Sequence, residues 1–189
     1  LRTLALLFTA LLLSIVLPLT VRAAYAEDCA GELRTLGLFQ GTQDGDQLDT
    51  EPTRAQMAVM LTRLLGGEAQ ALETPLEHPF TDSPSWLSPY MGWLWSKGLV
   101  NGTSATSFSP HTLCSADMYC TVLLRALDYS EQEGDFTYRT AAQKALEFGI
   151  AQWPLWEDGF TRGDMVILSR TLPESTASAD DLEKRFSDA

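Results

Sequence analysis

Two tetrapeptides in this chain place an arginine directly after a threonine at the expected start of a helix. They are Thr53-Arg54-Ala55-Gln56 and Thr161-Arg162-Gly163-Asp164. A threonine hydroxyl caps the first turn of a helix, and a glutamine three residues later completes a capping box. Capping explains Thr53 and Gln56, but it does not explain the arginines.

A guanidinium at the first position of a helix can bind an anion. It matches a carboxylate with two parallel hydrogen bonds, and the backbone N–H groups of the first turn also favour negative charge there. The alternatives are a structural ion pair within the protein and a solvated side chain. Arg54 and Arg162 are therefore candidate anion-binding residues.

The residues behind the caps predict amphipathic helices. After Thr53, one helical face is formed by Met57, Met60, Leu61, Leu64 and Leu65, and Gly66-Gly67 ends the helix. The stretch 115–127 matches this face position for position with Tyr119, Val122, Leu123, Ala126 and Leu127. A third capped helix is predicted over 161–172, and shorter helices are predicted ahead of the three caps over 29–36, 84–97 and 135–148.

These helices divide the chain into three helix–loop–helix units. The units are 27–67, 79–129 and 135–172, joined by acidic or polar linkers at 68–78 and 130–134, and 173–189 reads as a flexible tail or the start of a linker. A unit of this size cannot easily bury its own apolar face, so the units are expected to pack together as one all-α domain.

The first residues predict a secretory signal peptide. An apolar run from Leu4 to Leu19 follows Arg2, and Ala24-Tyr25-Ala26 supplies a small-residue cleavage site, which gives a signal peptide of residues 1–26. An uncleaved anchor is the alternative, but the run is shorter than the about 20 residues that a span needs. We therefore expect a secreted protein with no stable membrane span after cleavage.

The net charge of −12 excludes several classes of partner. Nucleic acid and anionic lipid surfaces call for clustered basic residues, which an acidic chain lacks. An anionic polymer would also be repelled at long range, so its binding must depend on a few local contacts.

The sequence offers little support for catalysis, a metal or a cofactor. His78 and His111 stand outside any metal motif, and no nucleophile elbow or phosphate loop occurs. Cys114 and Cys120 are too far apart on a helix for a disulfide, whereas a bond from Cys29 to either is open, and at least one thiol stays free or pairs with another chain.

Several motifs together resemble the S-layer homology family. Gly-Leu-x-x-Gly-Thr occurs at 37–42 and 98–103, Phe-Thr-Asp at 80–82 precedes a tryptophan, and Asn-Gly-Thr-Ser-Ala-Thr-Ser-Phe-Ser-Pro occupies 101–110, beside the two Thr-Arg tetrapeptides. The resemblance implies three repeats packed as a pseudo-threefold, three-pronged spindle around a shared helical core. It also implies non-covalent anchoring of an exported protein to a bacterial cell wall or surface layer.

The resemblance further implies the ligand and the residues that contact it. The ligand is secondary cell-wall polysaccharide, which is linked to peptidoglycan and often carries pyruvate ketals, and it lies in the grooves between repeats. Motif matching assigns its binding to Arg54, Arg162, Asp82, Gly41 and Gly102. Trp86 is the tryptophan expected at the surface for stacking on a sugar, whereas Trp93 is expected in the core.

The second copy departs from the family pattern at its helix cap. Either Ser115 or Ala116 stands where the other copies have arginine, so one or two working grooves are expected rather than three. Two other functions remain open at this point. One is a surface-layer self-assembly or protein-interaction subunit without glycan binding, and the other is the anchoring end of a longer exported enzyme.

Overall fold

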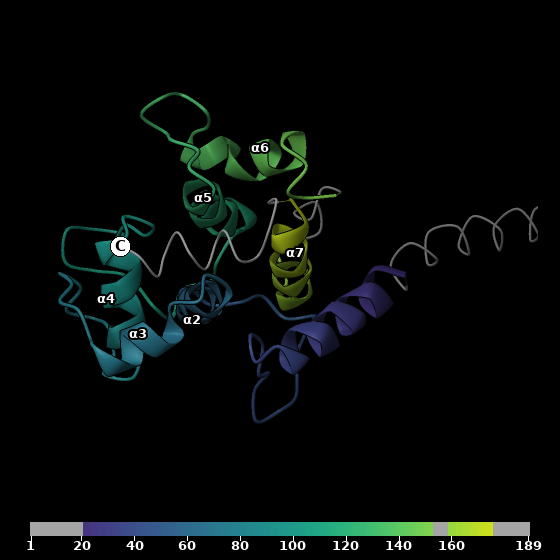
Figure 1. Cartoon of the computed structure of the whole chain (residues 1–189), viewed down its shortest axis with the longest axis horizontal. Helices are drawn as coiled ribbons and strands as arrows, with labels where there is room; N and C mark the ends of the chain where they lie inside the picture. The colour runs from purple at the N-terminus through teal and green to yellow at the C-terminus, as the bar shows by residue number, and fades with distance from the viewer. Residues whose placement is uncertain (1–20, 153–158, 176–189) are drawn as a thin grey trace, which may run out of the picture.

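The computed structural model describes residues 21–152 and 159–175, and these residues are mainly helical (Figure 1). The helices are 21–35, α2 (Arg54–Leu64), α3 (Glu68–Glu73), α4 (Ser88–Ser96), α5 (Ala116–Ala126), the 3₁₀ turn η1 (Tyr138–Thr140), α6 (Ala141–Glu147) and α7 (Arg162–Ser175). Within these ranges the only β pairing is two isolated bridges. The predicted all-α class is confirmed, and the threefold spindle stays a prediction.

The caps predicted at Thr53 for α2 and at Ser115 for α5 are both present. The Thr53 hydroxyl accepts a hydrogen bond from the Gln56 backbone N–H at 3.3 Å, and the Gln56 side chain accepts one from the Thr53 N–H at 2.8 Å. Ser115 accepts from the Met118 N–H at 3.2 Å. At the other end of α2, Gly66 takes a positive φ of 72°, which ends the helix as predicted.

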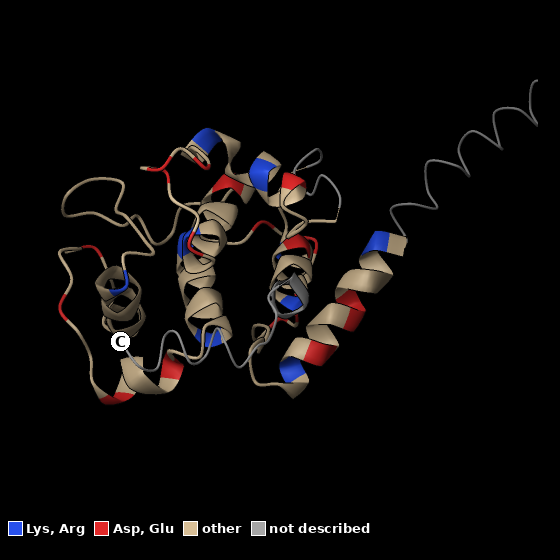
Figure 2. Cartoon of the chain, turned by 45° about the horizontal axis from the view of Figure 1, so that its top comes forward, with Lys and Arg blue, Asp and Glu red and all other residues tan. Residues whose placement is uncertain are grey.

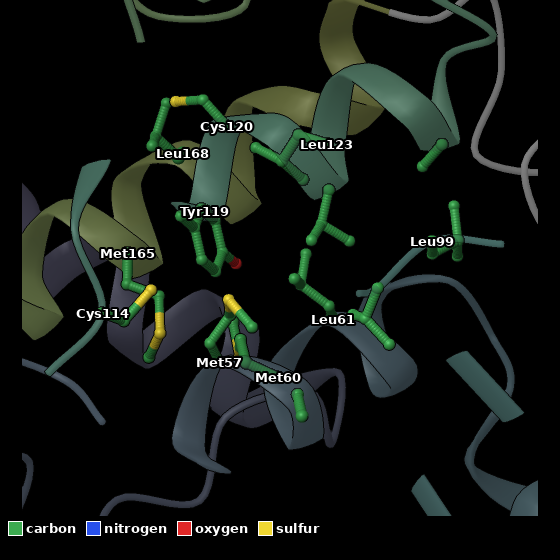
Figure 3. Packing of buried hydrophobic residues seen from close by; sticks show 14 of the residues in the cluster. Met57, Met60, Leu61, Leu99, Cys114, Tyr119, Cys120, Leu123, Met165 and Leu168 are labelled. Atoms are coloured by element: carbon green, nitrogen blue, oxygen red, sulfur yellow. The ribbon is translucent and has the colours of Figure 1, made fainter. Parts of the chain in front are cut away.

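The core lies where the three capped helices meet. Met57 and Leu61 of α2, Tyr119 and Leu123 of α5 and Met165 of α7 point toward one another (Figure 3). At its centre, the buried hydroxyl of Tyr119 lies 2.6 Å from the hydroxyl of Ser169 on α7. The apolar faces read from the sequence are therefore buried against one another, and one core serves all three units.

The described residues differ from the sequence predictions in several places. The linker 68–78 contains α3, because Ala71 is buried there and α3 packs on α4. The first helix already includes residue 21, ahead of the predicted 29–36, and Ala26 is buried. The signal peptide stays a prediction, since its apolar run lies outside the described residues, as do Trp153, Trp156 and the tail beyond 175.

The remaining core predictions concern tryptophan and cysteine. Trp93 is fully buried and Trp86 is 55% exposed, as expected. All three cysteines are buried and free, so no disulfide joins Cys29 to either of the others. In the described part of the chain no helix has the length and apolarity needed to cross a bilayer.

Gly31 and Gly92, which each lie six residues before another glycine, provide a matched pair of substitutions. Gly31 and Gly92 both precede a glycine turn, at Gly37 and Gly98. A Cβ at Gly92 would lie 2.0 Å from the Leu76 carbonyl oxygen, whereas a Cβ at Gly31 would meet nothing within 4 Å. We expect Gly92→Ala to lower the free energy of unfolding by about 1–3 kcal/mol through overpacking. Gly31→Ala should raise it by about 0.5–1 kcal/mol. Urea unfolding measures both, and a shift of the same sign would contradict this packing.

Candidate anion-binding site

Arg54 is buried at the start of α2, with only 7% of its surface exposed. Its Nε donates a hydrogen bond to the Phe108 carbonyl at 2.7 Å, and one terminal nitrogen donates to the Asn101 carbonyl at 3.3 Å. The guanidinium carbon also lies 4.3 Å from the centroid of the Phe108 ring, in cation–π contact. The side chain is thus fixed by a loop of the neighbouring unit.

Arg54 has no acidic side chain in direct contact among the described residues, although the carboxylate of Asp82 acts on it at longer range. Within the described residues it forms no ion pair, in contrast to Arg63 on the same helix, which pairs with Glu68 at 2.8 Å. Desolvation by burial lowers the pKa of Arg54. Burial of a cation without a direct ion pair is costly, so an anion that reached the guanidinium would gain a favourable interaction, although Glu131 also lines the cavity beside Arg54.

The helix N–H groups do not add to this site, which corrects the prediction from the cap. The Arg54 N–H donates to the Thr112 carbonyl and the Ala55 N–H to the Pro110 carbonyl, both at 2.9 Å. These donors dock α2 on the loop and are unavailable to a ligand. An anion would therefore depend on the guanidinium itself.

Asp82 holds the loop that carries Phe108. One carboxylate oxygen accepts from the Phe108 N–H at 2.8 Å, and the other accepts from the Ser109 N–H at 2.8 Å and from the Ser107 hydroxyl at 2.5 Å. Desolvation opposes ionisation of this group, but the three hydrogen bonds outweigh it and lower the pKa of Asp82 to about 2. Asp82 therefore positions the carbonyl that anchors Arg54.

Acidification tests this role of Asp82. A carboxylate with a lowered pKa contributes stability that is present above its unfolded pKa, about 3.9, and is lost as the pH falls toward the folded value of about 2. Asp82 is exposed, so solvent screening leaves only part of this contribution. Asp82→Asn lacks it, so its Tm should lie about 2–4 °C below wild type at neutral pH. The two Tm values should converge near pH 2. Thermal melts across this range measure the gap, and a gap that stays constant would contradict the clamp.

A cavity of about 330 Å³ opens beside Arg54. Its lining includes Arg54, Gly102, Thr103, Thr121, Arg125 and Tyr138. Gly102 is required by close packing, because a Cβ there would lie 2.3 Å from the Ser104 carbonyl oxygen. Arg125 is paired with Glu131 at 2.8 Å, so Arg54 is the arginine of the cavity that lacks an acidic partner among the described residues.

Sequence reasoning missed several of these residues. Phe108 and Asn101 belong to the quoted family motif, but they act through backbone carbonyls that no residue type reveals. Tyr138 comes from the third unit, where it follows Phe136-Thr137 as Asp82 follows Phe80-Thr81, and that alignment was an available signal. No signal in the sequence distinguished Thr121 from other helix residues.

Arg162 repeats the arrangement against the loop of the first unit. Its N–H donates to the Thr50 carbonyl at 2.8 Å, and its Nε donates to the Asp46 carbonyl at 2.9 Å. The side chain is 3% exposed, desolvation lowers its pKa, and it too forms no ion pair within the described ranges. Gly41 packs closely against the same loop, because a Cβ on it would lie 2.7 Å from a carboxylate oxygen of Asp46.

The predicted site residues therefore fall into two groups. Arg54, Gly102 and Asp82 gather at one loop, and Arg162 and Gly41 at the other. Trp86 does not line the cavity beside Arg54, and it is not a hydrogen-bond partner of Arg162. At the start of α5, Ser115 is the cap and Ala116 is the first helical residue, so alanine takes the place that arginine has in α2 and α7.

Acidic residues lie on several helices and loops of the chain (Figure 2). They are spread over the chain and gather at no single place. Within residues 21–152 and 159–175 no group of three or more His, Cys, Asp or Glu side chains is arranged to hold a metal ion.

Comparisons with known proteins find one family match and several relatives. Residues 79–115, which include Asp82, the loop through Phe108 and the Ser115 cap, match the S-layer homology domain family. The chain is 25% identical to the Middle cell wall protein of Brevibacillus brevis over 166 residues, which is 86% of this chain and 14% of that protein. It is 27% identical to the Surface layer protein of Brevibacillus choshinensis over 132 residues, which is 68% of this chain and 12% of that protein.

A third relative is an enzyme. The chain is 33% identical to an Endoglucanase of a Bacillus species over 81 residues, which is 43% of this chain and 8% of that protein. The chain thus spans between 8% and 14% of the length of these three relatives. The resemblance read from the motifs is confirmed at residues 79–115, which match the S-layer homology domain family, and the three tandem repeats stay a prediction.

Proposed function

We propose that this chain is a non-catalytic module that anchors an exported protein to the bacterial cell surface by binding secondary cell-wall polysaccharide. The S-layer homology domain at 79–115 and the relatives named for the cell wall and the surface layer support the anchoring role and the cell-surface location. The Endoglucanase relative fits the same role, since the shared 81 residues are only 8% of that enzyme.

One observation carries the choice of an anionic glycan as ligand. Arg54 is buried, forms no ion pair within the described residues and lines a cavity of about 330 Å³. A guanidinium has five N–H donors in a planar fork, and the Phe108 carbonyl, the Asn101 carbonyl and the Met118 sulfur take three of them. The remaining donors suit a carboxylate such as that of a pyruvate ketal.

Specific local contacts are needed because the protein and an anionic polymer repel one another. The chain carries a net charge of −12, so long-range attraction cannot concentrate the glycan at the site. Arg54 and Arg162 would each supply one local contact, which gives two active grooves, and the groove at Ala116 would lack its cation.

Sedimentation with purified sacculi tests this function. The full chain should pellet with intact sacculi from the bacterium that produces it, and it should stay in the supernatant when the sacculi have been stripped of secondary polysaccharide. Retention on both preparations would overturn glycan binding and favour a protein-interaction or self-assembly role. Self-pelleting without sacculi would point to surface-layer assembly.

A further inference from the structure

His78 is held by two hydrogen bonds that fix its protonation state. Its Nδ1 accepts from the Phe80 backbone N–H at 3.1 Å, and its Nε2 lies 2.8 Å from the hydroxyl of Ser88, the first residue of α4. A ring nitrogen that accepts from an N–H group carries no proton, so the ring is neutral and its proton is on Nε2, which donates to Ser88. Protonation of Nδ1 would set two donors against each other, and the bond to Phe80 would break.

Phe80 connects this bond to the loop that fixes Arg54. Its ring is buried, and the ring centroid lies 5.6 Å from that of Phe108. A Cβ on Gly102 would lie 2.6 Å from the Phe80 ring, so this ring also packs against a residue that lines the cavity. Phe108 in turn holds Arg54 through its carbonyl and its ring. A displacement of Phe80 would therefore disturb both the cavity wall and the anchor of Arg54.

The two residues after Phe80 continue the same support. The Thr81 N–H donates to the Thr106 carbonyl at 2.9 Å, and Asp82 accepts from the next part of the same loop. Residues 80–82, which we call the support segment, are therefore bonded to this loop over their last two residues. The histidine ring holds the first N–H of the support segment.

Burial favours the neutral form of the His78 ring. Desolvation lowers its pKa, and it outweighs the effect of Glu77 and Asp82, the two carboxylates that act on the ring and favour its protonation. The pKa of histidine in an unfolded chain is about 6.5. The stability that the neutral ring contributes is therefore present above about pH 6.5, and it is lost as the pH falls through the lower folded value.

We propose that His78 is an acid-sensitive switch of the Arg54 cavity, whose neutral ring holds the support segment in place and whose protonation releases it and weakens glycan binding. The proposal rests on the proposed function, since the glycan is the ligand that the cavity binds. The apparent affinity falls with the fraction of molecules that keep the binding-competent arrangement. Mild acidification would thus loosen the attachment to the cell wall.

Two substitutions separate the roles of the two ring nitrogens. The Oδ1 of asparagine matches the position of Nδ1, so in His78→Asn it can accept from the Phe80 N–H, and it does not take up a proton. The amide nitrogen of glutamine matches Nε2, so His78→Gln can donate to Ser88 but has no acceptor for the Phe80 N–H. The first variant imitates the neutral ring at Phe80 at every pH, and the second imitates the protonated ring.

Calorimetry at about pH 7.5 and about pH 5, on either side of the ordinary histidine pKa, measures the effect on binding. The probe is secondary polysaccharide released from purified sacculi, titrated into the full chain carrying Arg162→Met, so that only the Arg54 cavity reports. The affinity of this parent should fall about threefold to tenfold at the lower pH, as expected for one uncharged hydrogen bond. His78→Asn should bind equally well at both pH values, and His78→Gln should bind weakly at both.

His111→Asn is the matched control, because it removes the exposed histidine and should keep the pH dependence of the parent. Over the same range, the Tm of the parent should fall by about 2–4 °C more than that of His78→Asn. A parent with the same affinity at both pH values would overturn the switch and leave the proposed function intact, and so would a His78→Asn variant that keeps the parent's pH dependence. If the parent binds no polysaccharide at neutral pH, the proposed function itself fails, and the control of affinity by His78 fails with it.

Discussion

Replacing Arg54 by methionine should weaken polysaccharide binding at the Arg54 cavity by about 30-fold to 150-fold, because hydrogen bonds to a charged group contribute about 2–3 kcal/mol. The affinity should be measured by calorimetry in the full chain that carries Arg162→Met. Without that second change, the Arg162 site would sustain binding and hide the loss. The comparison is therefore between Arg162→Met and the double variant Arg54→Met/Arg162→Met.

The same substitution should leave the fold intact. Arg54 is buried without an acidic partner in the described part of the chain, so methionine removes a desolvated charge and keeps an unbranched apolar side chain. The variant loses the hydrogen bonds to the Phe108 and Asn101 carbonyls and the contact with the Phe108 ring. Replacement of a buried charged group by a well-packed apolar one is often neutral, so we expect a change in unfolding free energy within about 1 kcal/mol.

Arg63→Met is the matched control for this experiment. Arg63 lies on the same helix but pairs with Glu68 outside the cavity. Its replacement should leave the affinity unchanged. Equal affinities for the parent and the Arg54→Met variant would show that the cavity beside Arg54 does not bind the glycan.

Trp93→Ala should produce the largest loss of stability among the tryptophans that the structure describes, about 3–5 kcal/mol of unfolding free energy. The indole is fully buried, and its Nε1 donates to the Gln70 side chain at 2.8 Å. It also packs tightly under the start of α3, where a Cβ at Gly67 would lie 2.3 Å from the ring. Removing the indole would leave a cavity between α3 and α4 and an unpaired amide on Gln70.

Trp86→Ala provides the comparison for Trp93. Trp86 is 55% exposed and does not line the Arg54 cavity, so its loss should change stability by less than about 0.5 kcal/mol. Chemical denaturation measures both variants. Similar losses for the two would contradict the assignment of Trp93 to the core and Trp86 to the surface.

Much of the fold could be predicted because it depends on local patterns in the sequence. The Thr53 and Ser115 caps and the apolar faces behind them are encoded by residue type and spacing, and all are present in the structure. Helix α3 was missed because the stretch 68–78 is acidic and has no long periodic face, and its helix depends on packing against α4.

The candidate site could be predicted only in part. The sequence singled out Arg54, but it indicated neither the burial of that side chain nor the Phe108 carbonyl that holds it. Backbone carbonyls are common to all residues, so a contact with one leaves no trace in composition or motif. Asp82 as a ligand contact stays a prediction, and the sequence did not indicate that its oxygens also hold the loop through three donors that converge there in the folded chain.

A structure of the full chain with a fragment of the released polysaccharide tests the central claim most directly. We expect a carboxylate of the glycan within about 3 Å of the Arg54 guanidinium nitrogens. A glycan bound elsewhere on the chain, with the cavity beside Arg54 unoccupied, would contradict it.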